Sequence, residues 1–237
     1  MKKTYILTVI LMAVVSVYLL LKPSNSINEQ LTTGAFSQKI IDDNNLDFTD
    51  TYYFKGDVNN NYLIINNTLW RILSVDKKNN IKIIKDSKIA SQEEVEFSDN
   101  NSFNYKDSKL QKLLEEWYQE KFKDYDSYIK NNYYCSSYNA KCLSNITAKI
   151  SIATEEDYNN TFLDNKSFLT DSFDWWIISN NMYDAEEDIA YSAIITVDGE
   201  IYKFPTSELA GIRPIITIDG DVETTGKGTI EEPYFIK

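Results

Sequence analysis

The chain has 237 residues, of which 36 are acidic and 24 are basic, and its formal net charge at pH 7 is −12. This excess of negative charge repels phosphate backbones and offers little attraction to an anionic membrane surface, so we do not expect nucleic acid as a partner. The sequence contains no histidine, which removes the usual general base, the histidine-activated nucleophiles and the commonest zinc ligand. We therefore expect no catalytic residues of these types, and an enzyme built from this chain would depend on carboxylates or lysine.

The N-terminal 23 residues carry an apolar segment, residues 5–21, between Lys2-Lys3 and Lys22-Pro23. As a helix this segment would span roughly 25 Å, at the short end of the range that crosses a bilayer. A cleaved signal peptide would have a shorter apolar core and small residues at the cleavage site, for which residues 24–26 are a poor candidate. An uncleaved signal-anchor over residues 1–23 fits better, with the lysines in the cytoplasm. We expect a single-pass protein of the cell membrane with its domain on the extracellular side.

Residues 24–50 are rich in Asn, Asp, Ser, Thr and Gln, which predicts a polar stalk with a short helix near residues 36–41. The remaining segment, residues 51–237, has the length of a single domain with a sizeable core. Without the three lysines of the anchor, 21 basic and 36 acidic residues remain, a net charge of −15. Such acidity is typical of a secreted domain that must stay soluble.

Four β-rich segments open this domain at residues 51–54, 62–65, 68–75 and 81–85, and the turns between them predict an antiparallel meander. The two-residue link Asn66-Asn67 suits a tight hairpin. In the third segment Trp70 stands beside Arg71. This pair predicts a core tryptophan and a structural arginine that needs a polar partner.

Apolar residues recur at spacings of three and four over residues 107–122, which predicts an amphipathic helix packed on the sheet, with a second short helix over residues 125–129. Cys135 and Cys142 follow and are the only cysteines. Outside the membrane they predict a local disulfide that closes a loop and stabilises the fold by on the order of 2 kcal/mol. A redox or metal site would need Cys-x-x-Cys spacing or further ligands.

The second half of the domain alternates short strands and turns. Strands are predicted at residues 148–153, 168–170, 175–179, 191–197 and 233–236. Thr154 and Asp157 have the spacing of a capping box at the start of a helix over residues 155–159. Asp198-Gly199 predicts a hairpin turn.

Residues 211–218 form the densest β-branched segment after the anchor and predict a strand buried on both faces. Pro214 has no amide proton, so pairing on one side of this strand should be missing, bulged or begin one residue later. Arg213, held extended by the proline among isoleucines, calls for a carboxylate or carbonyl partner. We expect structural roles for Gly211, Arg213 and Pro214; a ligand contact by Arg213 is the alternative.

Four stretches carry a family resemblance when taken together and in order: Tyr52-Tyr53-Phe54-Lys55-Gly56 with Tyr62 and Leu69-Trp70-Arg71-Ile72, Ser167-Phe168-Leu169-Thr170 with Trp175-Trp176-Ile177-Ile178-Ser179, Gly211-Ile212-Arg213-Pro214-Ile215-Ile216, and Gly226-Lys227-Gly228-Thr229 with Pro233-Tyr234. They resemble the DUF6273-like extracellular domains of Gram-positive bacteria. The resemblance implies an α+β, C-type-lectin-like fold related to that of formylglycine-generating enzymes, with a mixed or antiparallel sheet and one or two flanking helices. No cysteine follows Cys142, so the reactive cysteine pair of those enzymes has no counterpart and oxidase activity is not implied.

Ligand contacts are expected around the tryptophan strand and the acidic turn that follows it. Trp175 and Trp176 offer rings that stack on sugars, although such a strand sends at least one indole into the core. The acids of residues 184–188 are hard oxygen ligands suited to calcium, with a solvated charge patch as the alternative. The lectin motifs Glu-Pro-Asn, Gln-Pro-Asp and Trp-Asn-Asp are absent from the sequence. The expected ligand-binding residues are Trp175, Trp176, Tyr183, Asp184 and Glu187.

These features favour a membrane-anchored, extracellular, non-catalytic binding or adhesion module of a Gram-positive cell surface, with a glycan or a protein as ligand. One alternative is a cell-envelope hydrolase that uses carboxylates. The other is a structural or regulatory ectodomain of a membrane complex. No cofactor is expected unless calcium binds at the acidic turn.

Overall fold

The computed structural model of this chain describes residues 35–44, 51–89, 94–138 and 141–236, except for the side chains at positions 35, 135–138, 141–145 and 181. The chain divides into two compact units, residues 1–31 and 32–237, and every described residue belongs to the second. The expected signal-anchor over residues 1–23 therefore lies outside the described residues. Among the described helices, none has the length and apolar character that a membrane span requires.

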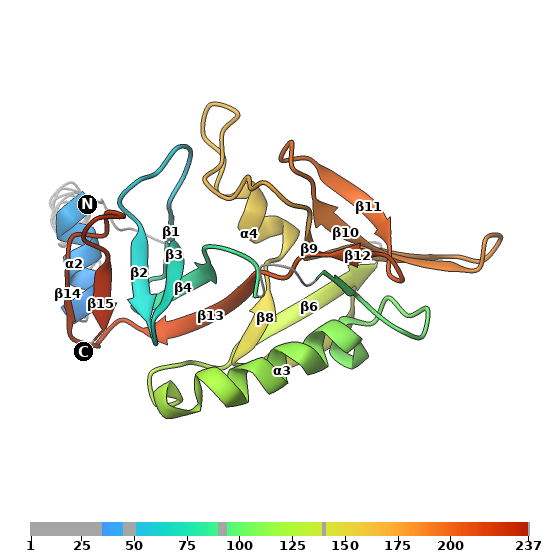
Figure 1. Cartoon of the computed structure of the whole chain (residues 1–237), viewed down its shortest axis with the longest axis horizontal. Helices are drawn as coiled ribbons and strands as arrows, with labels where there is room; N and C mark the ends of the chain where they lie inside the picture. Colours follow the sequence, from blue (N-terminus) through green and yellow to red (C-terminus); the bar gives the residue numbers. More distant parts are fainter. Residues whose placement is uncertain (1–34, 45–50, 90–93, 139–140, 237) are drawn as a thin grey trace, which may run out of the picture. The chain divides into compact units, whose positions relative to one another are not determined.

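The described residues form an α+β fold whose larger sheet has eight strands (Figure 1). The strands lie in the order β14-β15-β2-β3-β4-β13-β8, and β1 pairs with β3 beside this path. Asn66 and Asn67 both have positive φ and join β2 to β3 in the expected tight hairpin. The bounds are β1 (Tyr52–Tyr53), β2 (Tyr62–Ile65), β3 (Thr68–Val75), β4 (Asn80–Lys85), β8 (Ile150–Ile152), β13 (Pro214–Asp219), β14 (Thr224–Thr225) and β15 (Tyr234–Ile236).

A second sheet of five strands has the order β11-β10-β9-β6-β7, and a two-stranded ribbon pairs β12 with β5. Strands β6 and β7 form an antiparallel hairpin where the sequence suggested a loop, and β6 joins β9 in parallel. Cys135 and Cys142 lie in this hairpin, and the predicted disulfide between them falls outside the described side chains. The bounds are β5 (Val95–Glu96), β6 (Asn132–Tyr138), β7 (Lys141–Ala148), β9 (Trp175–Asp184), β10 (Ile189–Ile195), β11 (Ile201–Pro205) and β12 (Leu209–Ala210).

Three α-helices and two short 3₁₀ helices accompany the sheets in the described part of the chain. Helix α3 lies against β8 (Figure 1), and Ser108 caps its first turn by accepting a hydrogen bond from the amide of Gln111. Helix α4 begins at the predicted capping box, in which Thr154 and Asp157 bond reciprocally. The bounds are α2 (Ala35–Asn44), η1 (Tyr105–Asp107), α3 (Lys109–Lys121), η2 (Lys123–Tyr125) and α4 (Glu155–Asn159).

Helix α2 lies within the stretch that the sequence assigned to a polar stalk, but it belongs to the folded unit. Phe36 and Ile40 are fully buried, and the ring of Phe36 packs edge-on against Tyr234 at 5.2 Å between centroids. The hydroxyl of Tyr234 donates to Asp43 at 2.8 Å. The folded unit therefore begins before residue 51, because two apolar residues one turn apart give this polar helix a buried stripe.

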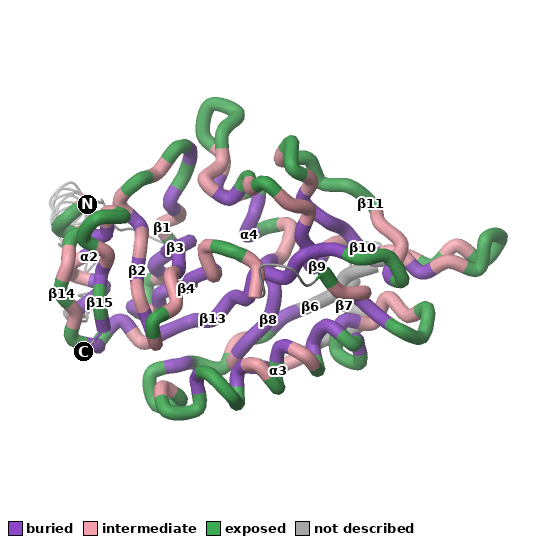
Figure 2. The backbone as a smooth tube through the Cα atoms, viewed as in Figure 1, coloured by how far each residue is buried: buried purple, intermediate pink, exposed green. Residues whose placement is uncertain are grey.

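Strand β13 lies between β4 and β8 at the centre of the core, and residues 211–218 are all buried (Figure 2). Pro214 pairs with Ile152 of β8, whereas pairing with β4 begins one residue later, at Ile215. The missing amide proton of the proline explains this offset, which is one of the arrangements that we predicted. A strand covered on both faces needs apolar residues at every position, and this requirement accounts for the isoleucine run.

Both arginines of the core hold backbone carbonyls, as their buried positions require. Arg213 is 1% exposed; its Nε donates to Lys85 O at 3.1 Å, its Nη1 donates to Leu169 O at 2.9 Å, and Asp171 lies 3.8 Å away. Arg71 donates from Nη2 to Val58 O at 2.6 Å. The expected carbonyl and carboxylate partners of Arg213 are thus confirmed.

Gly211 and Trp70 also occupy buried positions that fit the structural roles expected of them. A Cβ atom at position 211 would lie 2.8 Å from the ring of Phe173, so a larger residue has no room there. Trp70 is fully buried and contacts the ring of Phe122 edge-on at 5.5 Å between centroids. These contacts fix the loop before β9 and the end of α3 to the larger sheet.

Candidate functional site

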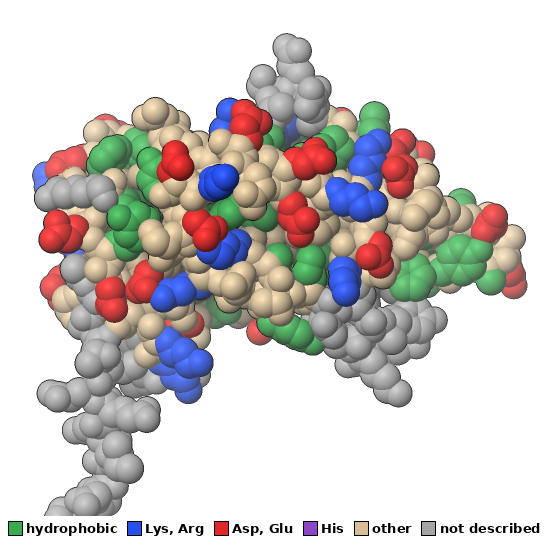
Figure 3. Space-filling view, turned by 90° about the horizontal axis from the view of Figure 1, so that it is seen from below, with side chains coloured by type: hydrophobic (Ala, Val, Ile, Leu, Met, Phe, Trp, Pro, Cys, Tyr) green, Lys and Arg blue, Asp and Glu red, His purple; other side chains and the backbone are tan. Residues whose placement is uncertain are grey.

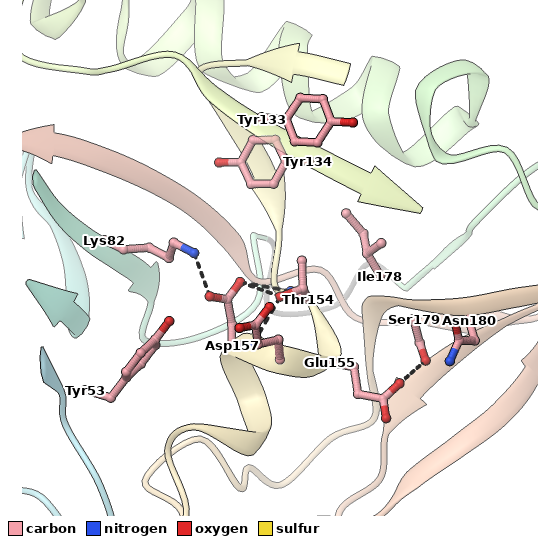
Figure 4. A pocket seen from close by; sticks show the side chains of 11 residues that line it. Tyr53, Lys82, Tyr133, Tyr134, Thr154, Glu155, Asp157, Ile178, Ser179 and Asn180 are labelled. Atoms are coloured by element: carbon pink, nitrogen blue, oxygen red, sulfur yellow. Dashed lines mark hydrogen bonds and ion pairs between the residues drawn. The ribbon is translucent and has the colours of Figure 1, made fainter. Parts of the chain in front are cut away.

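A pocket of about 370 Å³ lies where the larger sheet, the second sheet and helix α4 meet (Figure 4). Strands β1 and β4 supply one wall, β6 and β9 supply the other, and the first turn of α4 forms the base. Polar side chains dominate the lining: Tyr53, Lys82, Tyr133, Tyr134, Thr154, Glu155, Glu156, Asp157, Ile178, Ser179 and Asn180.

Local sequence rules place α4 at this pocket. The hydroxyl of Thr154 accepts a hydrogen bond from the amide of Asp157 at 3.1 Å, and the Asp157 carboxylate accepts from the amide of Thr154 at 3.1 Å. This capping box satisfies amides that would otherwise be unpaired at the helix start. Consequently the three consecutive acids, Glu155, Glu156 and Asp157, project from the first turn of a helix whose position is fixed.

An ion pair between Lys82 and Asp157 joins the larger sheet to α4. Lys82 Nζ lies 2.6 Å from Asp157 Oδ1, and their side chains are 28% and 2% exposed. Neighbouring Ile81 and Ile83 are buried, so the alternation of β4 turns Lys82 to the pocket. Burial alone would lower the pKa of Lys82, but the Asp157 carboxylate outweighs this effect and the pKa is raised.

Both carboxylate oxygens of Asp157 already accept hydrogen bonds from the fold. Its Oδ1 accepts from Lys82, while Oδ2 accepts from both the amide and the hydroxyl of Thr154, at 3.1 and 2.9 Å. A buried carboxylate whose two oxygens both accept hydrogen bonds within the fold is poorly placed to exchange a proton with a ligand. We therefore assign a structural role to the buried pair of Lys82 and Asp157, which fixes the position of α4 at the pocket.

Tyr134 supplies an unpartnered polar group to the pocket. Its side chain is 3% exposed, and its hydroxyl makes no hydrogen bond to any described residue. The side-chain amide of Asn132 is close enough to lower the pKa of Tyr134 slightly, and it donates a hydrogen bond to Lys130 O at 3.4 Å. Burial, with smaller contributions from Tyr105 and Asp157, raises the pKa of Tyr134, so the hydroxyl keeps its proton at neutral pH. Figure 4 shows this hydroxyl directed to the side of the pocket where the Lys82 ammonium lies.

The remaining carboxylates of the pocket, Glu155 and Glu156, lie on the base that α4 forms. Glu155 Oε2 accepts a hydrogen bond from the hydroxyl of Ser179 on β9. The side chain of Glu156 is exposed and forms no hydrogen bond or ion pair with the described residues. Tyr133 presents a ring that is 62% exposed. The base and the β6 wall therefore combine two carboxylates that form no ion pair with a described residue and an exposed aromatic ring.

The pocket lining is more negative than the face of the molecule shown in Figure 3. There, basic and acidic side chains are interspersed. In the pocket, Lys82 is the one basic group among the lining residues, against the three acids of α4. An anionic ligand is therefore disfavoured, whereas hydroxyl and amine groups find carboxylate, hydroxyl and amide partners.

The structure overturns the expectation that Trp175 and Trp176 contact a ligand. Both side chains are 0% exposed. Trp176 Nε1 donates to Val95 O at 2.7 Å, and Trp175 packs beneath the guanidinium of Arg213 at 5.0 Å from its ring centroid. The strand is covered on both faces, so both indoles enter the core, one into each of its two clusters.

The other expected ligand residues lie at the far end of β9. Tyr183 is 42% exposed, and its hydroxyl donates to Asp188, while Asp184 accepts from the amides of Glu186 and Glu187 at 3.0 and 3.2 Å. These bonds close the turn between β9 and β10. Among the described residues, no group of three or more acidic side chains lies together in a way that suits a metal ion.

The structure does not bring Tyr183, Asp184 and Glu187 together with the two tryptophans. Strand β9 runs from Trp175 to Asp184, and at about 3.3 Å per residue its ends are roughly 30 Å apart. The pocket instead uses the middle of β9, at residues 178–180. Sequence reasoning missed this site, although the capping box and the three acids behind it were visible signals.

No protein family model matches the chain, and neither does any curated protein or any solved structure. The class that the described residues define is an α+β domain with a polar, acidic pocket between two sheets.

Proposed function

We propose that this chain is a non-catalytic binding module and that the pocket between β4, β6, β9 and α4 is its recognition site. The observation that carries the proposal is the buried hydroxyl of Tyr134, which lines the pocket and lacks a hydrogen-bond partner among the described residues. Buried polar groups are almost always paired, and an unpaired one costs about 1–3 kcal/mol of stability. A bound ligand would supply the missing partner.

The hydrogen bonding of the pocket carboxylates favours a binding function over the hydrolase alternative. Asp157 is the most buried acid of the pocket and is occupied by three donors. A hydrolase of the carboxylate type needs one acid that releases a proton and a second that attacks or activates water. These hydrogen bonds fix the side chain of Asp157, as suits a rigid binding site. Such a site loses little conformational entropy when a ligand binds.

We further propose that the module is displayed on the extracellular side of a cell membrane, with residues 1–23 as its anchor and a C-type-lectin-like arrangement of the domain. The apolar segment after Lys2 and Lys3 supports the anchor. The order of the four stretches that resemble DUF6273-like domains supports the fold assignment, and parts of these stretches form β1, β3, β9, β13 and β15. Protease treatment of intact cells should digest residues 32–237; full protection would place the domain in the cytoplasm.

The binding role is tested by incubating the full chain with arrays of peptides and of neutral, cationic and anionic saccharides. We expect retention of a polar ligand that Tyr134→Phe weakens. Tyr183→Phe is the matched control, because Tyr183 also hydrogen-bonds through its hydroxyl but lies in the distant β9–β10 turn. Binding lost in the control and kept in Tyr134→Phe would move the site to that turn. Turnover of a saccharide that disappears in Glu155→Gln would favour the hydrolase.

A further inference from the structure

The charges of the pocket do not balance. Lys82 and the three acids of α4 leave a formal charge of −2 among the lining residues at neutral pH. The ammonium of Lys82 is held 2.6 Å from Asp157, which is its ion-pair partner, whereas Glu156 attracts it only from a longer distance. Glu155 and Glu156 therefore give the open side of the pocket its charge.

The outer carboxylates lack a cationic partner in the described part of the chain. Ser179 donates one hydrogen bond to Glu155, and the Glu156 carboxylate has no hydrogen bond or ion pair with the described residues. Adjacent like charges repel each other, and a cation placed between them would relieve that repulsion. A cationic ligand would supply such a charge.

The deeper part of the pocket offers groups that suit an amine. The hydroxyl of Tyr134 accepts as well as donates hydrogen bonds and has no partner among the described residues. The exposed ring of Tyr133 and the half-buried ring of Tyr53 offer faces that attract cations. Ile178, which is 2% exposed, supplies an apolar surface beside them.

We propose that this pocket binds a primary ammonium group carried on an alkyl chain, as on a lysine side chain of a protein ligand. Glu155 and Glu156 would form ion pairs with the ammonium, the Tyr134 hydroxyl would accept one of its hydrogen bonds, and Ile178 would contact the alkyl chain. A pocket of about 370 Å³ has room for such a group. This assignment of ligand class rests on the proposed binding role of the pocket.

The test uses calorimetric titration of the full chain with Nα-acetyl-lysine-N-methylamide and with its Nε-acetylated form, which has the same backbone but no charge. We expect the charged probe to bind at least about tenfold more tightly, because hydrogen bonds to charged groups contribute more than neutral ones. Glu156→Gln should weaken its binding about two- to fivefold, as expected for a solvent-exposed ion pair. Glu120→Gln, an exposed acid on α3, should leave it unchanged.

Equal affinity for the two probes would overturn the ammonium assignment. So would tighter binding of N-acetylglucosamine that does not change in Glu156→Gln. If Tyr134→Phe still weakens binding of that neutral ligand, recognition at this pocket stands and only the ligand class is wrong. If no probe or array member binds in a Tyr134-dependent way, both proposals fail.

Discussion

Lys82 on β4 and Asp157 on α4 lie 75 positions apart in the sequence, and their side chains meet at 2.6 Å. Asp157 also closes the capping box of α4. One carboxylate thus starts a helix and ties that helix to the larger sheet. The arrangement makes the stability of the fold and the geometry of the pocket depend on the same residue.

Removing the lysine should expose this dependence. Lys82→Met leaves the Asp157 carboxylate buried without its counter-charge, and breaking a buried pair in this way costs about 3 kcal/mol. We expect a matching fall in the free energy of unfolding measured in urea, at an unchanged m-value. Lys109→Met is the control, since the pair of Lys109 with Glu96 is exposed and should contribute less than about 1 kcal/mol. Equal effects of the two substitutions would mean that the Lys82 pair is not buried in solution.

Tyr134→Phe should separate stability from binding. The hydroxyl has no partner among the described residues, so its removal should leave stability unchanged or raise the free energy of unfolding by about 1 kcal/mol. Ligand binding should weaken at the same time, as is common where a functional group is kept at a cost to stability.

Tyr105→Phe is the matched comparison for that substitution. The Tyr105 hydroxyl is bonded to Ser151 Oγ at 2.9 Å and accepts from the amide of Ile152 at 3.2 Å. Its loss should cost about 1–2 kcal/mol, because it leaves a buried amide unpaired. A loss of stability in Tyr134→Phe as large as that in Tyr105→Phe would show that the Tyr134 hydroxyl has a partner in solution.

Arg213→Met should destabilise the protein without changing ligand affinity. The substitution leaves the carbonyls of Lys85 and Leu169 without their buried donor, for a loss of about 3 kcal/mol. Thermal unfolding followed by circular dichroism measures this change, with Lys227→Met at an exposed ion pair as control. A variant with normal thermal stability but no ligand binding would reassign Arg213 to ligand contact.

High pH should destabilise the fold. The pKa values of several buried tyrosines are raised, mainly by burial, whereas tyrosines of the unfolded chain ionise near pH 10. Since the unfolded state releases its protons first, stability is complete below about pH 10 and falls above it. Lys82, whose pKa is also raised, acts in the same direction. The tyrosines are Tyr105, Tyr118, Tyr134 and Tyr234.

Urea unfolding between pH 8 and pH 11 measures this dependence. Tyr234→Phe should make the fall of the unfolding free energy with pH less steep, whereas Tyr202→Phe at an exposed position should not. Burial lowers the pKa of Arg213 to about 10, which opposes the trend but concerns a single group. Stability that stays constant up to pH 11 would contradict the burial of the tyrosines.

Local patterns predicted much of the fold. The strands at residues 62–65 and 68–75 and the helix at 155–159 were predicted within the bounds that the structure gives to β2, β3 and α4. Each has a strong local signal: a β-branched run between turns, or a capping box. The hairpin of β6 and β7 was missed, because its polar residues resemble a loop and its pairing with β9 is a contact between distant parts of the chain.

The site could not be predicted in the same way. Lys82 looks like an ordinary solvent-facing residue of a β-strand, and Tyr134 looks like one of several tyrosines before the cysteines. Their significance comes from the meeting of β4, β6 and α4, which no local pattern encodes. The prediction that Trp175 and Trp176 contact a ligand was wrong because their local pattern suggested more than the fold allows. Two adjacent tryptophans form a ligand surface only when one face of their strand is open to solvent.

The place of β15 in the larger sheet has a consequence for biosynthesis. This strand lies between β14 and β2 and pairs in parallel with β2, so Leu63 meets Tyr234 across 171 positions of sequence. Pairing over such a separation carries a high loop-closure cost and is slow. While residues 234–236 are still being made, β2 has an unpaired edge, which can join strands of other chains. A chaperone that covers this edge during synthesis would raise the yield of folded protein without altering its final stability.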